Sequence, residues 1–139
     1  MRVLVVEDEE IVGKVLKHRF EKIGASVEIV TLWRDALARL SQNPKPQIVS
    51  LDLVLPDCQL SHPQQIAEVR KHAPDSLLLV VSGFAESASK EDGPKADAYI
   101  DKRQDGISFY DVVMQQVASR KGFEDDLPII QETVRRMTK

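Results

Sequence analysis

Residues 47–52 read QIVSLD, a nearly continuous apolar run that ends at a carboxylate. Apolar residues at almost every position, rather than in alternation, are typical of a short strand that is buried on both faces of a parallel sheet. Residues 77–81, LLLVV, have the same character. Residues 62–72 between the two runs are predicted to be helical, with Pro63 near the first turn. Together these stretches indicate a strand, a crossover helix and a second parallel strand.

The same alternation extends in both directions along the chain. Short apolar runs predict further strands, and amphipathic stretches predict further helices. The strands are expected at residues 2–6, 26–30 and 97–100, and the helices at residues 9–23, 33–41 and 106–120. The stretch 84–95 is polar and contains Gly93-Pro94, so we expect one or two helical turns there at most. The pattern indicates an α/β fold, a five-stranded parallel sheet with helices on both faces, in the common strand order 2-1-3-4-5.

Composition narrows the functional classes. The chain has 139 residues, 42% hydrophobic and 29% charged, which is ordinary for one soluble globular domain. Its net charge is −3 and its basic residues are scattered, unlike those of a nucleic-acid-binding protein. No stretch approaches the roughly 20 apolar residues that cross a membrane, and the first residues are unlike a signal peptide. Cys58 is the single cysteine, which fits a reducing compartment. We therefore expect a cytoplasmic protein that binds neither nucleic acid nor membranes.

Functional side chains follow four of the five predicted strands. The first strand ends at Glu7-Asp8 and the third at Asp52, while Ser82 follows the fourth and Lys102 the fifth. The carboxyl ends of parallel strands meet at one edge of the sheet, where ligands bind in such folds. We therefore expect three carboxylates, a hydroxyl and an amine to gather at this edge.

This set of groups suits phosphoryl transfer. Carboxylates that lie close together raise one another's pKa, and a hard divalent cation such as Mg²⁺ relieves the repulsion while leaving positions for phosphate oxygens. Lys102 and Ser82 could neutralise and hold a phosphoryl group, and the Asp52 carboxylate could accept it as an aspartyl-phosphate. Each residue alone has an ordinary structural reading, as a helix-terminal charge, an N-cap, a turn residue or a solvated lysine. Their conjunction at one edge favours the chemical reading.

Four stretches resemble the response-regulator receiver family. They are VLVVEDEE at 3–10, IVSLDLVLPD at 48–57, LLVVSG at 78–83 and ADAYIDK at 96–102. The resemblance covers about residues 1–120, and it implies a flavodoxin-like receiver fold in a two-component phosphorelay. The segment 121–139 then forms a C-terminal extension.

The resemblance implies a metal site and a phospho-acceptor. Asp52 would accept the phosphoryl group and also bind Mg²⁺. Asp8 would bind the same ion directly, and Glu7 would contribute directly or through water. The backbone carbonyl of Val54 would be a further ligand.

The resemblance also implies a switch and its partners. Ser82 would bond to a phosphoryl oxygen and move on activation, Lys102 would pair with the acyl phosphate, and Tyr99 would swing between outward and inward rotamers. The donor would be a sensor histidine kinase or a phosphotransfer protein, and the output an unknown downstream protein. The chain would catalyse only its own phosphorylation and dephosphorylation, so we do not class it as an enzyme.

Three features depart from the family pattern and keep alternatives open. Arg103 follows Lys102 where the family usually has proline, residues 57–60 replace a glycine-rich turn, and the fourth helix, on the usual output face, is short. The short fourth helix and the missing proline slightly favour a receiver-like binding module that switches without phosphorylation. A phosphatase of the aspartyl-nucleophile type is a weaker alternative, because Val54 stands where those enzymes carry a second aspartate as general acid.

The segment 121–139 is predicted to contain a helix. Asp125 and Asp126 can cap it, and Pro128 suits its first turn. An apolar stripe runs along it at helical spacing, formed by Leu127, Ile130, Val134 and Met137. This stripe could pack on the chain's own core, form a homodimer contact or begin a linker.

Overall fold

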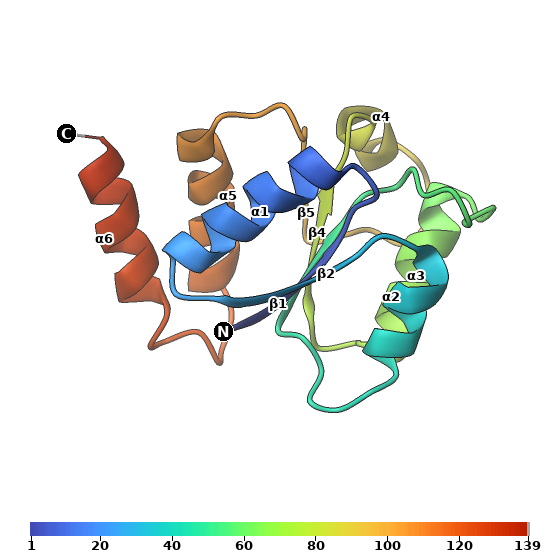
Figure 1. Ribbon diagram of the computed structural model, residues 1–139, viewed down its shortest axis with the longest axis horizontal. Coiled ribbons are helices and arrows are strands. Elements are labelled where there is room, and N and C mark those ends of the chain that lie inside the picture. The colour runs from blue at the N-terminus through green and yellow to red at the C-terminus, as the bar shows by residue number, and fades with distance from the viewer. Residues whose placement is uncertain (139) are drawn as a thin grey trace.

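The computed structural model describes residues 1–138, and its strands and helices alternate as the sequence predicts (Figure 1). The strands are β1 (Arg2–Val6), β2 (Ser26–Val30), β3 (Ile48–Leu51), β4 (Leu77–Val81) and β5 (Ala98–Ile100). The helices are α1 (Glu10–Lys22), α2 (Trp33–Leu40), α3 (His62–His72), α4 (Ala85–Ser89), α5 (Gly106–Ala118) and α6 (Leu127–Met137). The predicted ends of the five strands and of α1, α2, α3 and α5 differ from these bounds by two residues at most, as is usual for element termini.

The sheet has five parallel strands in the order β2-β1-β3-β4-β5, which confirms the predicted topology. The order places β1 and β3 side by side, with Val6 opposite Leu51. The residues that directly follow these two strands, Glu7 and Asp52, are therefore brought together by the strand register itself.

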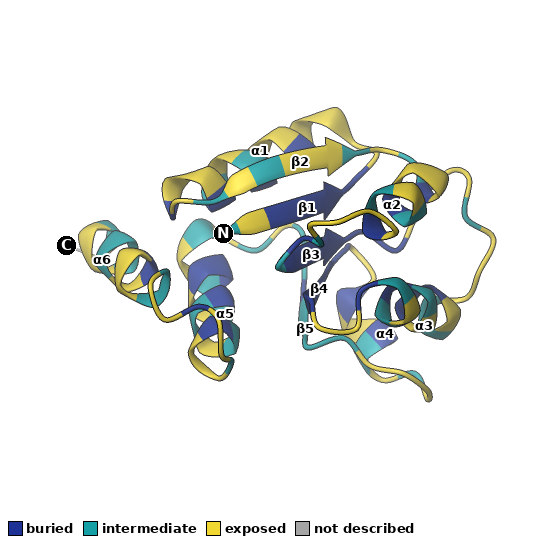
Figure 2. Cartoon of the chain, turned by 90° about the horizontal axis from the view of Figure 1, so that it is seen from below, coloured by how far each residue is buried: buried dark blue, intermediate teal, exposed yellow. Residues whose placement is uncertain are grey.

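Two apolar clusters fill the two faces of the sheet. Val3 and Val5 of β1 pack with α1, α5 and α6 on one face, whereas Leu4 and Val6 pack with α2, α3 and α4 on the other. Figure 2 shows the central strands buried and the outer surfaces of the helices exposed. Burial on both faces explains why the central strands are apolar at almost every position.

Local signals set the ends of several helices. Gly24 has φ 89° just after α1, a left-handed conformation that favours glycine and ends a helix. A reciprocal capping box between Ser61 and Gln64 starts α3. The fourth helix, α4, has five residues, which confirms the predicted short helix. None of the helices in residues 1–138 is long and apolar enough to cross a membrane.

The C-terminal helix α6 packs back on the domain, alongside α5 (Figure 1). Ile130 is fully buried, and the other residues of the predicted stripe, Leu127, Val134 and Met137, are half-buried against the same cluster as α1 and α5. The reading of the stripe as core packing is therefore confirmed. The division into residues 1–120 and 121–139 stays a prediction.

The predicted side-chain cap of α6 is wrong. Asp126 occupies the N-cap position, but its backbone is helical and its side chain caps no backbone N–H of the helix. Its Oδ1 lies 3.9 Å from the amino group of Met1 instead. The helix starts with Pro128 in its first turn, as predicted, because proline has no N–H that needs a partner there.

Candidate phosphoryl and metal site

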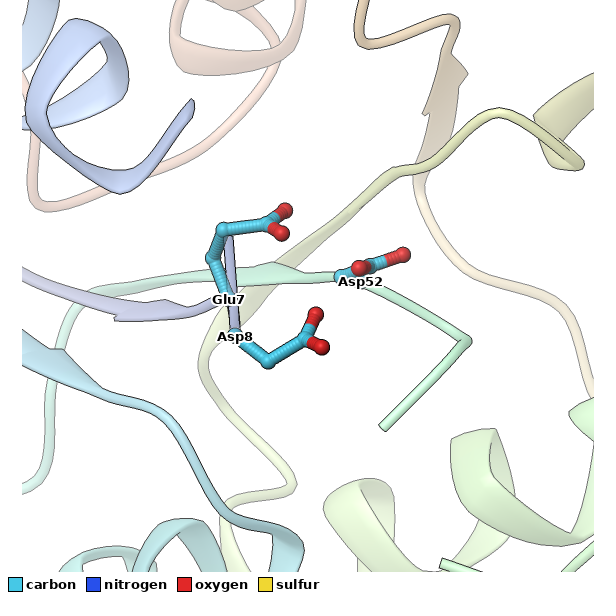
Figure 3. Close-up of side chains that lie close together, drawn as sticks. All are labelled: Glu7, Asp8 and Asp52. Carbon is cyan, nitrogen blue, oxygen red and sulfur yellow. The ribbon is translucent and has the colours of Figure 1, made fainter. Parts of the chain in front are cut away.

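Three carboxylates meet at the carboxyl ends of β1 and β3. Figure 3 shows the side chains of Glu7, Asp8 and Asp52 pointing toward a common space. One oxygen from each lies within 4.8 Å of the others. Glu7 and Asp52 are buried, with 1% and 2% of their surface exposed, while Asp8 is exposed. The predicted cluster therefore has a buried base and an open side.

An open pocket of about 200 Å³ lies over this cluster. Its wall is formed by the ends of β1, β3, β4 and β5, and five of the predicted site residues line it. The lining residues are Asp8, Glu9, Asp52, Val54, Ser82, Gly83, Phe84 and Lys102. Glu7 lies within ion-pair distance of Lys102, so the structure brings all five charged and hydroxyl residues of the prediction to one edge.

Lys102 reaches into the carboxylate cluster. Its Nζ lies 3.6 Å from Asp52 Oδ2 and 3.8 Å from Glu7 Oε1, but its shortest contact, at 2.7 Å, is with Glu9 Oε1. Burial acts to lower the pKa of the Lys102 amine, but the hydrogen bond to Glu9 and the charges of Asp52 and Glu7 outweigh it, so the pKa is raised. The amine therefore stays charged beside the phospho-acceptor candidate.

Glu9 is a site residue that sequence reasoning missed. It belongs to the acidic run EDEE at residues 7–10, in which the first two residues match the family pattern. The third looks like an ordinary helix N-terminal charge, and it indeed directly precedes α1. Its contact with Lys102 joins residues 93 positions apart, and no local sequence signal indicates it.

Glu7 carries the strongest electrostatic perturbation of the site. Burial, more than any other cause, raises the pKa of its carboxyl to about 7, and the negative charge of Asp52 adds to this. The backbone N–H of Glu9, which donates to Oε1 at 3.0 Å, opposes the rise. At pH 7 the Glu7 carboxyl is therefore about half protonated, and a divalent cation bound beside it would favour its charged form.

The donor set fits a hard divalent cation. Within the described chain, Glu7 Oε2 and Asp52 Oδ2 are both buried without a hydrogen-bond partner. Buried polar atoms normally have partners, and such an exception at a functional edge points to an ion or ligand. All the available donors are oxygens, which Mg²⁺ prefers, and Asp8 adds a third carboxylate from the open side.

Asp52 and Ser82 occupy neighbouring strand ends of the pocket. Asp52 Oδ1 accepts a hydrogen bond from the backbone N–H of Val54 at 3.3 Å, so Oδ2 is the oxygen without a hydrogen bond. Ser82 is fully buried and its Oγ accepts from the backbone N–H of Phe84 at 3.2 Å. Since the hydroxyl only accepts there, its own proton remains able to donate to a ligand.

Solved structures of known proteins share this fold. The receiver domain of a sensor histidine kinase from Pseudomonas aeruginosa, with a magnesium ion coordinated in its active-site cleft, superimposes with a TM-score of 0.71 at 16% identity, over 85% of this chain and 98% of its own. A CheY-like receiver domain protein from Methanospirillum hungatei gives 0.67 at 20% identity, over 97% of both chains. The chain has the receiver fold.

A response regulator from Burkholderia pseudomallei adds a chemical observation. That structure, with a phosphorylated aspartic acid, a calcium ion and citrate, matches the receiver fold of this chain with a TM-score of 0.65 at 21% identity, over 99% of this chain and 92% of its own.

By sequence, no protein-family model matches the chain, and no curated protein matches it either.

Tyr99, the predicted switch residue, lies in β5. Its ring is half-buried against the cluster that holds α2, α3 and α4, and its hydroxyl accepts a hydrogen bond from the backbone N–H of Ala96 at 3.0 Å. In this structure the Tyr99 hydroxyl is therefore bonded to the loop that leads into β5. The switch role of Tyr99 stays a prediction, as do the individual roles of the other site residues.

The receiver fold accommodates a residue other than proline after Lys102. Within residues 1–138 the one cis peptide bond is Asn43–Pro44, so the Lys102–Arg103 peptide is trans. The Asp101 carboxylate accepts from the Arg103 backbone N–H at 2.8 Å and from its guanidinium at 2.8 Å. The hydrogen bond from the guanidinium has the largest effect and that from the backbone N–H adds to it, and together they lower the pKa of Asp101 to about 2. These hydrogen bonds, called here the Asp101–Arg103 clamp, close the turn, and the Lys102 amine still lies 3.6 Å from Asp52 Oδ2.

The loop after Asp52 is tied to α2 through Asp57. The two carboxylate oxygens of Asp57 accept from the backbone N–H groups of Trp33 at 2.7 Å and Arg34 at 3.0 Å. The N-cap position of α2 is Leu32, which has no side-chain acceptor. Asp57 therefore caps a helix that lies 24 residues earlier in the chain. Sequence reasoning noted the unusual loop residue but not this role.

Proposed function

We propose that this chain is a phospho-acceptor of a two-component phosphorelay, phosphorylated on Asp52 with the help of Mg²⁺. The observation that carries the proposal is the meeting of three carboxylates and the Lys102 amine beneath one open pocket, with an oxygen of Asp52 that has no hydrogen-bond partner. A phosphorylated aspartic acid in one solved structure of the same fold, and a magnesium ion in another, support it.

The transfer requires little of the protein beyond positioning and charge. Asp52 Oδ2 attacks the phosphorus atom of the donor, and an oxygen–phosphorus bond forms as the bond to the leaving nitrogen or oxygen breaks. The leaving group departs with the bonding electron pair, and the product is an acyl phosphate. Lys102, 3.6 Å from Oδ2, offsets the negative charge of the transferred group, and the Ser82 hydroxyl can donate to one of its oxygens.

Mg²⁺, held by Glu7, Asp8 and Asp52, would neutralise the phosphoryl oxygens during transfer. The backbone carbonyl of Val54 would complete the protein ligands. Of the chain's own residues, Glu9 has a second task, because it holds the Lys102 amine at 2.7 Å before a phosphoryl group arrives. We propose that Lys102 leaves Glu9 for the acyl phosphate on activation.

The proposal extends to partners and output. The donor would be a sensor histidine kinase or a phosphotransfer protein in the cytoplasm, and the output a conformational change, through Ser82 and Tyr99, that a protein partner reads. With a net charge of −3, nucleic acid is not an expected partner. The chain would act only on itself, so it would not be an enzyme with an external substrate. A homodimer contact stays a prediction.

Intact mass after incubation with acetyl phosphate tests the proposal directly. We expect the wild type to gain the mass of one phosphoryl group in the presence of Mg²⁺, and Asp52→Asn to gain none. Asp57→Asn is a matched control, because this aspartate lies in the same loop but outside the pocket. Undiminished phosphorylation of Asp52→Asn, or a yield that does not depend on Mg²⁺, would contradict the proposal.

A receiver-like binding module that is not phosphorylated is the second candidate. The five-residue α4 and the Asp101–Arg103 clamp, which stands where receivers usually have proline, favour it. Beryllofluoride titration with Mg²⁺, followed by the fluorescence of Trp33, separates the two. Trp33 is the single tryptophan and bonds to the loop that follows Asp52, so a response indicates a phosphoryl site and no response indicates the module.

A further inference from the structure

Gln65 of α3 is a buried amide beside the loop that follows Asp52. Only 1% of the residue is exposed, which is rare for glutamine. Its Nε2 donates to the carbonyl oxygen of Leu53 at 3.1 Å and to the Sγ of Cys58, also at 3.1 Å. One side chain therefore holds both the residue that directly follows Asp52 and a residue farther along the same loop.

The bond to Leu53 bears directly on Asp52. The carbonyl of Leu53 and the N–H of Val54 belong to one peptide unit, which is planar and rigid. The carbonyl end accepts from Gln65, and the N–H end donates to Asp52 Oδ1 at 3.3 Å. Because the two groups share a plane, the bond at one end sets the direction of the other. Gln65 thus orients the N–H that orients the Asp52 carboxylate.

Packing alone does not explain a glutamine at this position. Its Oε1 is buried and has no hydrogen-bond partner in residues 1–138, which is unfavourable for a polar atom. A leucine or methionine would fill similar space without burying an amide. The reverse orientation of the amide would place Oε1 against the Leu53 carbonyl, two acceptors in contact. The amide group of Gln65 is therefore oriented so that its Nε2 donates to the Leu53 carbonyl.

We propose that Gln65 is a positioning residue for the phospho-acceptor: it holds the Leu53–Val54 peptide in one orientation and thereby fixes the orientation of the Asp52 carboxylate at the base of the pocket. The consequence for phosphoryl transfer rests on the proposed function of Asp52. The consequences for the geometry of the loop and for cation binding do not rest on it. The positioning role of Gln65 and the phosphorylation of Asp52 can therefore be refuted independently.

The test compares Gln65→Met with Gln64→Met. Both replace a glutamine of α3 by an apolar residue, but Gln64 belongs to the capping box and its Oε1 accepts from the Ser61 backbone N–H, away from the site. In Gln65→Met we expect a shifted NMR amide signal of Val54 with faster hydrogen exchange. We also expect Mg²⁺ affinity to fall by about tenfold, the usual effect of losing a partner behind a metal ligand.

Phosphorylation by acetyl phosphate at saturating Mg²⁺ should also slow by about tenfold in Gln65→Met and not in Gln64→Met. If Gln65→Met folds but keeps the Val54 signal and the Mg²⁺ affinity of the wild type, or if Gln64→Met changes them equally, the positioning role is wrong. If phosphorylation is absent in the wild type while the Val54 and Mg²⁺ effects appear, the positioning role stands and the proposed function fails.

A measurement on the wild type covers the case in which Gln65→Met does not fold. The side-chain amide protons of Gln65 are buried and bonded, so we expect them to exchange with deuterated water much more slowly than those of the exposed Gln64. Equal exchange rates for the two side chains would overturn the proposal.

Discussion

At the scale of single residues, the charge state of Glu7 links the site to pH. Burial, with the charge of Asp52, raises the pKa of its carboxyl from the ordinary 4.5 to about 7. A carboxyl whose pKa is raised on folding favours the folded state while it is protonated. Its contribution to the free energy of unfolding is therefore fully present below about pH 4.5 and is lost as the pH rises through about 7.

We accordingly predict that, without Mg²⁺, the Tm of the wild type falls relative to that of Glu7→Gln between about pH 5 and pH 8. The shift corresponds to a loss of at most about 3 kcal/mol. Mg²⁺ binds the deprotonated carboxyl, so it should raise the wild-type Tm more at the upper end of this range. Thermal melts with and without Mg²⁺ measure both effects, and a Mg²⁺ effect that is the same at every pH would contradict the assignment.

Val54 and Phe84 bear on the lifetime of the phosphorylated state. The resemblance places these residues, two after Asp52 and two after Ser82, on either side of the phosphoryl group. In the structure both line the pocket over Asp52 and are exposed, at 51% and 55%, so water that enters the pocket meets two apolar side chains. Neither can hydrogen-bond to that water, and the resulting hypothesis is a long-lived acyl phosphate.

We predict that Val54→Asn and Phe84→Lys or Phe84→Glu dephosphorylate about twofold to tenfold faster than the wild type, since one hydrogen bond contributes about 0.5–1.5 kcal/mol. The rate is measured by intact mass after the donor is removed. Exposed Ile107, outside the pocket lining, provides a control in Ile107→Asn. Polar variants that hydrolyse no faster than the wild type would show that water positioning at these two residues does not set the lifetime.

At the scale of elements, α2 depends on a residue outside itself. Leu32 offers no side-chain cap, and Asp57 supplies both acceptors from the loop that also contains Asp52. The hydrogen bond from the Arg34 backbone N–H is the main cause that lowers the pKa of Asp57. Desolvation opposes it, and the hydrogen bond from the Trp33 backbone N–H adds to the lowering. Its contribution to stability is therefore present above the ordinary value of 3.8 and is lost as the pH falls through the lowered pKa.

We predict that Asp57→Ala lowers the Tm and speeds hydrogen exchange of the Trp33 and Arg34 amides, because both donors lose their partner. Asp57→Asn keeps one acceptor oxygen and should have a smaller effect. Residue-resolved hydrogen exchange measures the change in α2. If exchange in α2 is the same in Asp57→Ala and the wild type, the helix does not depend on this contact.

At the scale of the whole molecule, α6 completes the apolar face formed by α1 and α5. Ile130 is fully buried in that face, whereas its neighbour Ile129 is 47% exposed. The tail is therefore part of the packed structure.

We predict that Ile130→Ala lowers the free energy of unfolding by about 2–4 kcal/mol, because it removes a buried side chain and leaves a cavity. Ile129→Ala, the same substitution one position earlier, should change it by about 0.5 kcal/mol or less. Denaturant unfolding measures both. Deletion of residues 122–139 should lower the Tm further, and light scattering on the same samples shows whether α6 also affects association. Equal effects of the two isoleucine variants would contradict the packing role.

The sequence by itself determined the fold and predicted which strand ends meet at the candidate site, although it did not indicate Glu9. Hydrophobic periodicity is a local property, so it predicted the five strands and α1, α2, α3 and α5 to within two residues. The parallel order then brought the residues after four strands to one edge, and Asp52, Asp8, Ser82 and Lys102 indeed line one pocket. The side-chain cap at Asp126 failed, because the backbone of this residue is itself helical and its carboxylate lies near the amino group of Met1.

Only the tertiary structure decided which partners each site residue has. The contact of Lys102 with Glu9 spans 93 residues, that of Asp57 with Trp33 spans 24, and that of Gln65 with Leu53 spans 12. Such contacts depend on how loops close and which rotamers the packing allows, and neither leaves a periodic trace in the sequence. The chemistry of the strand ends could therefore be predicted from local pattern, whereas the residues that hold those ends in place could not.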